Sequence, residues 1–213
     1  MKVKICGLTR REDLAACQGA DLVGVVTGYP RSPRNLSLSE AKGILEAARG
    51  RFLRVVVLTA PSASDIAAAF QAGADRVQVH GPLPTGGAAA PAATLIPSLA
   101  LPKDPARGLP PTWDRLWRGP FPLVHLDTGG EDRAGGTGRP WDWARWAGPL
   151  TREPREFLLA GGLTSENVVR AMAALHPWGV DVSSGVESRP GEKDPARIQA
   201  FIRTVRAWEG AHA

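Results

Sequence analysis

The sequence predicts an α/β fold, a single (β/α)8 barrel that spans residues 1–213. Short apolar strands alternate with helical stretches about eight times, and such alternation indicates parallel strands joined by helical crossovers. Within several strands, polar and apolar side chains also alternate, as expected when the two faces of a sheet meet different surroundings. A doubly wound open sheet is the structural alternative.

Eight segments have the length and the apolar, β-branched composition of buried strands. They are 2–6, 21–27, 53–59, 75–80, 94–101, 122–128, 157–162 and 180–184. The 213 residues fall somewhat below the ~250 residues that are typical of this barrel.

Helices are expected between these strands. Gly19 and Gly50 end two of the helical stretches, where glycine is a typical stop. Ser39 is the expected N-cap of the second helix, and Thr164 or Ser165 that of the helix that follows the seventh strand. The predicted helices are 10–19, 37–50, 62–73, 164–175 and 194–208.

Two other segments between strands lack a helical pattern. Residues 82–111 are rich in Pro, Gly and Ala, so the fourth helix of the barrel is expected to be short or missing. Residues 135–143, GGTGRPWDW, combine a glycine cluster with two tryptophans. Glycine permits either a flexible loop or a turn against a ligand, and we expect Trp141 and Trp143 to pack rather than to bind a ligand.

Polar residues two positions apart occur near the ends of four predicted strands. A half-solvated antiparallel sheet would alternate in the same way, but helices between the strands must cover the apolar face. We therefore expect the polar face to line the barrel interior, with its last members at the C-terminal rim, where active sites of this fold lie. The pairs are Lys4 and Cys6, Gln78 and His80, His125 and Asp127, and Asp181 and Ser183.

Glycine-rich turns follow the last two predicted strands, at 160–167 (AGGLTSEN) and 183–187 (SSGVE). Free backbone N–H groups and helix N-termini bind anions, and the loops after strands 7 and 8 are the usual phosphate site of the barrel. Glycines also form ordinary turns, so either turn alone is a weak signal. Together they predict a phosphorylated small-molecule ligand.

Cys6 and Asp127 end strands on the polar face, where a thiolate can act as base and a carboxylic acid can donate a proton. A free cysteine has a pKa of about 8.5, so the pKa of Cys6 must be shifted for it to serve as a base near neutrality. Lys4, on the same face, is a candidate cause. A buried apolar role is commoner for free cysteines, and we expect it for Cys17.

Composition argues against several other classes. With 43% hydrophobic and 22% charged residues, the chain has the composition of a globular domain. The absence of an 18-residue apolar run and of a signal-peptide pattern predicts no membrane span and, with two cysteines, a cytoplasmic protein. The net charge of +5 comes from scattered cations, which favours a small anionic substrate over nucleic acid. No Cys/His cluster has zinc spacing, so no metal is expected.

Seven motifs together resemble the phosphoribosylanthranilate isomerase family of tryptophan biosynthesis. They are KICGLT (4–9), SPR (32–34), VQVHG (77–81), LDT (126–128), GGTG (135–138), LAGGL (159–163) and DVSSGVE (181–187) with EKD (192–194). The family is a single (β/α)8 barrel that catalyses an Amadori rearrangement. The resemblance implies conversion of N-(5-phosphoribosyl)anthranilate to 1-(2-carboxyphenylamino)-1-deoxyribulose 5-phosphate by general acid–base catalysis, without a cofactor or metal.

The resemblance also implies roles for individual residues. Cys6 corresponds to the catalytic base, Asp127 to the acid, and Arg34 to a contact of the anthranilate group. The residues that would line the substrate site are Gln78, His80 and Asp181. The residues whose backbone would hold the phosphate are Gly161, Gly162, Ser183, Ser184 and Gly185.

The sequence departs from the family pattern in the 27–34 loop, which lacks the usual aromatic residues, at Arg139, where lysine is common, and around the fifth strand. Two related phosphosugar barrels are disfavoured. A histidine-pathway Amadori isomerase would end its first strand in aspartate, and indole-glycerol-phosphate synthase would use lysine and glutamate. A non-catalytic phosphate-binding barrel remains an alternative. The sequence is compatible with a homodimer, although no apolar stripe identifies an interface.

Overall fold

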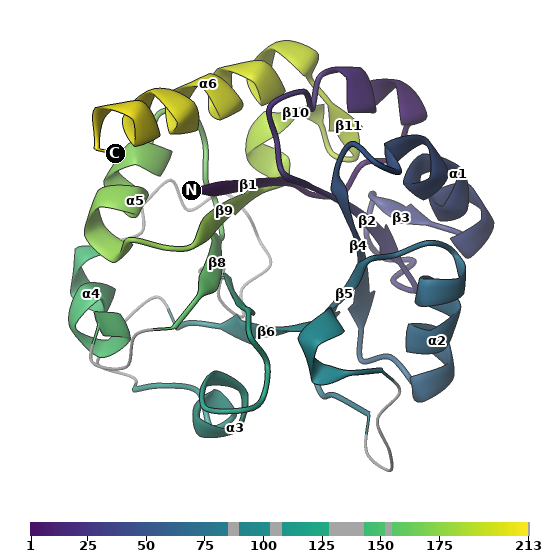
Figure 1. Cartoon of the computed structure of the whole chain (residues 1–213), viewed down its shortest axis with the longest axis horizontal. Coiled ribbons are helices and arrows are strands. Elements are labelled where there is room, and N and C mark those ends of the chain that lie inside the picture. Colours follow the sequence, from purple (N-terminus) through teal and green to yellow (C-terminus); the bar gives the residue numbers. More distant parts are fainter. Residues whose placement is uncertain (85–89, 103–107, 128–142, 152–154, 213) are drawn as a thin grey trace.

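Eight parallel strands form a closed barrel at the centre of the protein, with helices around the outside (Figure 1). The computed structural model describes residues 1–84, 90–102, 108–127, 143–151 and 155–212. The barrel strands are β1 (Lys2–Ile5), β2 (Leu22–Thr27), β4 (Leu53–Thr59), β5 (Arg76–His80), β6 (Leu95–Ala100), β7 (Val124–Asp127), β8 (Phe157–Ala160) and β9 (Gly179–Val182).

The barrel closes because β1 pairs in parallel with both β2 and β9. Each strand lies in a predicted segment, apart from Gly179, which precedes the predicted start of the last strand. The short strand β3 (Asn35–Leu36) extends the sheet beside β2, and the antiparallel pair β10 (Glu187–Arg189) and β11 (Glu192–Lys193) follows β9. The prediction of a (β/α)8 barrel is therefore confirmed, and the open sheet is excluded.

The helices agree with the predictions only in part. Three lie within predicted helical segments, and α6 begins in one but continues to Ala211, beyond its predicted end at residue 208. The helices α3 and α4 were not predicted, and residues 10–19 hold only the 3-10 helix η1 (Arg11–Ala15). The described part of 82–94 contains one short 3-10 helix, η2 (Ala92–Thr94), as expected for a short or missing fourth helix. The α-helices are α1 (Leu38–Ala48), α2 (Ala63–Gln71), α3 (Trp113–Trp117), α4 (Ala144–Thr151), α5 (Val168–Leu175) and α6 (Pro195–Ala211).

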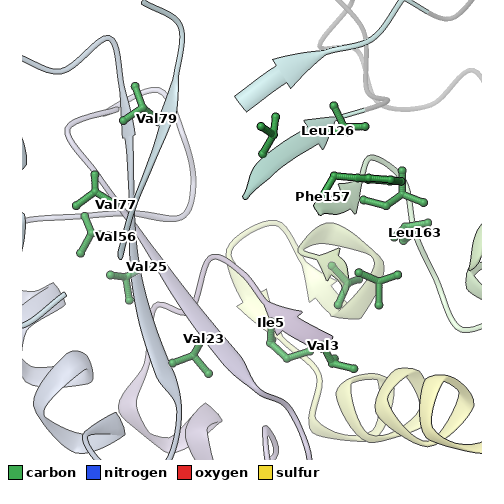
Figure 2. Close-up of a cluster of buried hydrophobic side chains, with 14 of the residues drawn as sticks. Val3, Ile5, Val23, Val25, Val56, Val77, Val79, Leu126, Phe157 and Leu163 are labelled. Carbon is green, nitrogen blue, oxygen red and sulfur yellow. The ribbon is translucent and has the colours of Figure 1, made fainter. Parts of the chain in front are cut away.

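The apolar face of each strand points outward, as its alternation predicts. Figure 2 shows Val3, Val23, Val56 and Val77 on the outer side of the barrel wall, where they belong to the main hydrophobic core. Residues of the other parity face the interior, where a small apolar cluster is formed by Cys6, Leu22, Val55 and Val57. The helices thus cover one face of the sheet and leave the other face to line the site.

Two expectations about core residues can be checked. Cys17 and Trp143 are buried in the main core, as predicted, whereas Trp141 and the rest of 135–142 lie outside the described residues. No helix in the described part of the chain has the length and hydropathy of a membrane span.

Ser37, and not Ser39, caps α1, so this N-cap prediction was wrong. Ser37 Oγ accepts a hydrogen bond from the Glu40 amide at 3.3 Å, while the Glu40 carboxylate accepts one from the Ser37 amide at 2.8 Å. This reciprocal pair is the capping box S-x-x-E, which SLSE (37–40) contains. Ser39 lies one residue inside the helix.

We expect Ser37→Ala to lower the free energy of unfolding by about 1 kcal/mol, because an N-cap acceptor is lost. Ser39→Ala is the matched control and should change it by less than about 0.5 kcal/mol. Urea unfolding of both variants measures the difference. Equal losses, or a larger loss in Ser39→Ala, would contradict the assignment of the cap.

Candidate active site

A buried ion pair joins β1 to β9 inside the barrel. Lys4 and Asp181 are register partners, with Nζ 2.8 Å from Oδ2 and side chains that are 0% and 5% exposed. Burial disfavours both charges, but it is outweighed by their mutual attraction and hydrogen bond together with the contributions of Cys6 to Lys4 and of His125 to Asp181. The pKa of Lys4 is therefore raised, and the pKa of Asp181 is lowered to about 2.

Hydrogen bonds extend this pair toward β5. Lys4 Nζ donates to Gln78 Oε1 at 3.0 Å, which orients the amide so that Gln78 Nε2 donates to His80 Nε2 at 2.9 Å. His80 therefore accepts at Nε2 and carries its proton on Nδ1. Burial, with the neighbouring His125, lowers the pKa of His80 to about 4, so the ring is neutral at physiological pH.

A second branch runs from Asp181 to β6. His125 Nε2 donates to Asp181 Oδ2 at 3.0 Å, and His125 Nδ1 lies 2.6 Å from Ser98 Oγ. The His80 and His125 rings meet edge to face, with centroids 5.4 Å apart. Five strands thus contribute to one network. All members except Ser98 were predicted to lie on the polar face of the strands.

Cys6 lies directly after β1 and is buried beside the Lys4 ammonium, within its hydrogen-bonding reach. Gly24 of β2 leaves room for both groups, since a Cβ there would lie 3.1 Å from Cys6 Sγ and 3.4 Å from Lys4 Nζ. Burial raises the pKa of Cys6, and the attraction of Lys4, itself opposed by Asp181, does not compensate. Lys4 was the candidate cause of a shift of the Cys6 pKa toward neutrality, but the pKa is raised instead, so the group is a neutral thiol at pH 7.

Asp127 is the last residue of β7, so it shares the C-terminal rim of the barrel with Cys6. The strands β8 and β9 separate β7 from β1 along the wall. Asp127 is partly exposed, in contrast to the buried Asp181. The two candidate catalytic groups therefore lie at one rim of the barrel, at the ends of different strands.

The two predicted phosphate loops lie against each other. Gly161 and Gly162, after β8, have φ of 96° and 64°, values that L side chains rarely adopt. Gly185, in the 3-10 helix η4 (Ser184–Val186) after β9, packs so closely that a Cβ would lie 1.9 Å from Leu163 O. The structure thus brings the Gly161–Gly162 and Ser183–Gly185 segments together, and their role in binding phosphate stays a prediction.

Asn167 stabilises the first of these loops. Its Oδ1 accepts a hydrogen bond from the Thr164 amide at 2.8 Å, and its Nδ2 donates to Gly162 O at 2.9 Å. Asn167 is also the N-cap residue of α5, so the prediction of Thr164 or Ser165 was wrong. Those two residues belong to the turn that Asn167 closes.

Arg34 lies at the same rim and is paired with Glu187. Its Nε and Nη2 donate to the two carboxylate oxygens of Glu187 at 2.7 and 2.6 Å. Lys193 Nζ donates to Glu187 Oε1 at 2.7 Å and to Ser183 O at 3.1 Å. Glu187 and Lys193 lie in the DVSSGVE and EKD motifs, but no role was predicted for either residue.

The described residues include no group of three or more His, Cys, Asp or Glu side chains that could hold a metal ion. The ion pair and its hydrogen bonds pair most polar atoms of this network, although Asp181 Oδ1 is buried without a hydrogen-bond partner among the described residues. This arrangement can exchange protons and bind anions with side-chain and backbone groups alone.

The chain was compared with known families and proteins. A family model described as N-(5'phosphoribosyl)anthranilate (PRA) isomerase matches residues 3–204. Proteins named N-(5'-phosphoribosyl)anthranilate isomerase are similar over their whole length. The one from Halobacterium salinarum is 38% identical over 97% of this chain and 96% of its own, and the one from Azorhizobium caulinodans is 40% identical over 99% and 94%.

Solved structures agree with these matches. The phosphoribosyl anthranilate isomerase of Thermotoga maritima superposes with a TM-score of 0.80 at 31% identity, covering 97% of this chain and 99% of its own. A phosphoribosyl anthranilate isomerase in complex with reduced 1-(o-carboxyphenylamino)-1-deoxyribulose 5-phosphate gives 0.78 at 29% identity, over the same shares of the two chains.

We expect Lys4→Met to lower the free energy of unfolding by about 3–5 kcal/mol, because it leaves the Asp181 carboxylate buried without its cation. Lys2→Met is the matched control. Lys2 also pairs with an aspartate, Asp21, at 2.9 Å, but its side chain is 49% exposed, so the loss should stay below about 1 kcal/mol.

Urea unfolding gives both values. If Lys4→Met lowered the free energy of unfolding by no more than Lys2→Met does, the buried pair would stabilise the protein no more than an exposed pair.

Proposed function

The chain belongs to the N-(5'-phosphoribosyl)anthranilate isomerase family, and we propose that it converts N-(5-phosphoribosyl)anthranilate to 1-(2-carboxyphenylamino)-1-deoxyribulose 5-phosphate in tryptophan biosynthesis. The observation that carries the proposal is the placement of Cys6 and Asp127 on one barrel rim, in a chain that matches the family model over residues 3–204. The reaction is an Amadori rearrangement and needs an acid and a base.

Asp127 is the proposed acid. It donates its proton to the ribose ring oxygen, the bond from that oxygen to C1 breaks, and the anthranilate nitrogen forms a Schiff base with C1. The partial exposure of Asp127 at the rim supports this role, because an acid must reach the substrate rather than the buried network.

Cys6 is the proposed base. Its thiolate takes the proton from C2 of the Schiff base, the electron pair forms the C1–C2 double bond, and the resulting enolamine tautomerises to the ketone. The Lys4 ammonium supports this role because it stabilises the thiolate. The raised pKa of Cys6 makes the thiolate a scarce but strong base.

Binding groups surround these two residues in the proposal. The guanidinium of Arg34 pairs with the anthranilate carboxylate, and the backbone of Gly161, Gly162, Ser183, Ser184 and Gly185 holds the phosphate. Gln78, His80 and Asp181 line the floor of the site in the proposal. Lys4 donates to both Gln78 and Asp181, and Gln78 donates to His80, so these hydrogen bonds keep the side chains oriented. A phosphate-binding barrel without catalysis would need no thiol beside a buried ammonium, so we prefer the enzyme.

Three broader expectations stay predictions: that residues 1–213 form a single domain, that the protein works in the cytoplasm, and that it forms a homodimer. Two free cysteines are consistent with a reducing compartment. A Thermotoga maritima enzyme of the family is described as dimeric. The described surface exposes Leu109 and Val169 as its large apolar residues, and they do not define an interface.

We expect Cys6→Ser and Asp127→Asn each to lower kcat by about 10²- to 10⁴-fold, the usual contribution of a general base or acid. The measurement is the loss of substrate, followed through the fluorescence of its anthranilate group. Both variants should stay folded, because neither Cys6 nor Asp127 is part of the Lys4–Asp181 pair.

Cys17→Ala and Asp114→Asn are the controls, since Cys17 lies in the outer core and Asp114 is exposed on α3. Both should retain wild-type turnover. Near-wild-type rates in Cys6→Ser and Asp127→Asn would refute the assigned roles, and an inactive wild type would refute the function.

The pH dependence follows from the raised pKa of Cys6. Catalysis requires a proton on Asp127 and none on Cys6, so the active form is the state in which the pair holds one proton. That state is lost on the alkaline side only when the last proton leaves, at the raised pKa of the thiol. We therefore expect the alkaline fall of kcat/KM to come only above about pH 9. An alkaline limb with its midpoint below about pH 8 would contradict this assignment.

A further inference from the structure

The pairing of Arg34 and Glu187 uses only one edge of the guanidinium. Nε and Nη2 point at the Glu187 carboxylate, whereas Nη1 makes no hydrogen bond to the residues that the structure describes. The fork geometry of arginine allows a second anion to be bound while the first contact stays in place. Arg34 can therefore be held by Glu187 and still bind a ligand.

The cluster formed by Arg34, Glu187 and Lys193 carries a net positive charge. Arg34 and Lys193 are cations and Glu187 is the single anion between them, with its side chain 3% exposed. Burial opposes the charge of Glu187, but the two cations overcome this and lower its pKa. One positive charge is left over at the rim, which suits an anionic substrate group.

Close packing fixes the position of Arg34 next to the candidate base. Gly7, the residue after Cys6, has φ of 75°, and a Cβ there would lie 2.6 Å from Arg34 Cδ. On the other side, Gly191 at the tip of the β10–β11 hairpin packs against Pro33, where a Cβ would lie 2.4 Å from Pro33 O. The loop that carries Arg34 is thus held between the first strand end and the hairpin.

Glu187 is itself tied to the phosphate loop. Glu187 and Lys193 are cross-strand partners in the hairpin, and Lys193 Nζ also donates to the carbonyl of Ser183. The position of the Glu187 carboxylate is therefore set by the segment that carries Ser183, Ser184 and Gly185. The proposed phosphate and carboxylate sites are connected through these contacts.

We propose that Glu187 is a positioning residue that holds Arg34 by its Nε and Nη2 edge, so that the guanidinium is oriented in advance for the aromatic carboxylate of the substrate. This rests on the proposed function. Fixing a long side chain before binding removes the entropy cost of ordering it in the complex. Glu187 then acts on substrate binding through Arg34 and takes no part in the proton transfers.

The test compares Glu187→Gln in the wild-type protein and in an Arg34→Met background. In the wild-type background we expect KM for phosphoribosylanthranilate to rise about tenfold, with kcat changed less than about threefold, because a charge-assisted contact is weakened. In the Arg34→Met background, Glu187→Gln should add no further rise. The competitive inhibition constant of inorganic phosphate should stay within about threefold of wild type in all variants.

Asp75→Asn is the matched control, since it breaks a two-point pair of the same kind, from Arg54 to Asp75 at 2.9 and 2.7 Å, outside the site. It should leave KM unchanged. The inference is overturned if Glu187→Gln leaves KM unchanged, raises it equally in the Arg34→Met background, or weakens phosphate inhibition in parallel. A wild-type protein without turnover would refute the proposed function instead, so the two failures are distinguishable.

Discussion

The buried ion pair between Lys4 and Asp181 is the interaction on which the rest of the barrel interior depends. Each charge would be costly to bury alone, and each is stable here because the other is 2.8 Å away. Lys4 also orients the Gln78 amide and thereby the tautomer of His80, while Asp181 accepts from His125. One pair therefore fixes which atoms of Gln78, His80 and His125 donate and which accept.

This pair also explains the state of Cys6. The positive charge of Lys4 is already compensated by Asp181, so less of it is available to stabilise a thiolate, and burial raises the pKa of the thiol. A neutral thiol can be buried at little cost in free energy, and it becomes a strong base once it loses its proton. The proposed chemistry then uses a thiolate that forms when Cys6 loses its proton, rather than a thiolate that is present at all times.

Much of this arrangement could be predicted from sequence, because strand parity places Lys4, Gln78, His125 and Asp181 on one face without knowledge of the fold's details. The direction of the Cys6 pKa shift could not be predicted from sequence, since it depends on burial and on which anion pairs with Lys4. Glu187 lies 153 residues from Arg34 in the sequence, and no local sequence pattern indicates that the two side chains are in contact. The helix α4 was missed because Gly148 and Pro149 lie within it, where both residues normally indicate a break.

The most direct test of the central claim is a titration of the Cys6 thiol in Cys17→Ala protein, in which Cys6 is the only cysteine, by the ultraviolet absorbance of the thiolate. We expect a midpoint above that of an ordinary free thiol, because burial outweighs the partly neutralised charge of Lys4. A midpoint near or below neutrality would contradict it, since the Lys4 charge would then be free to act on the thiolate and Asp181 would not be its main partner.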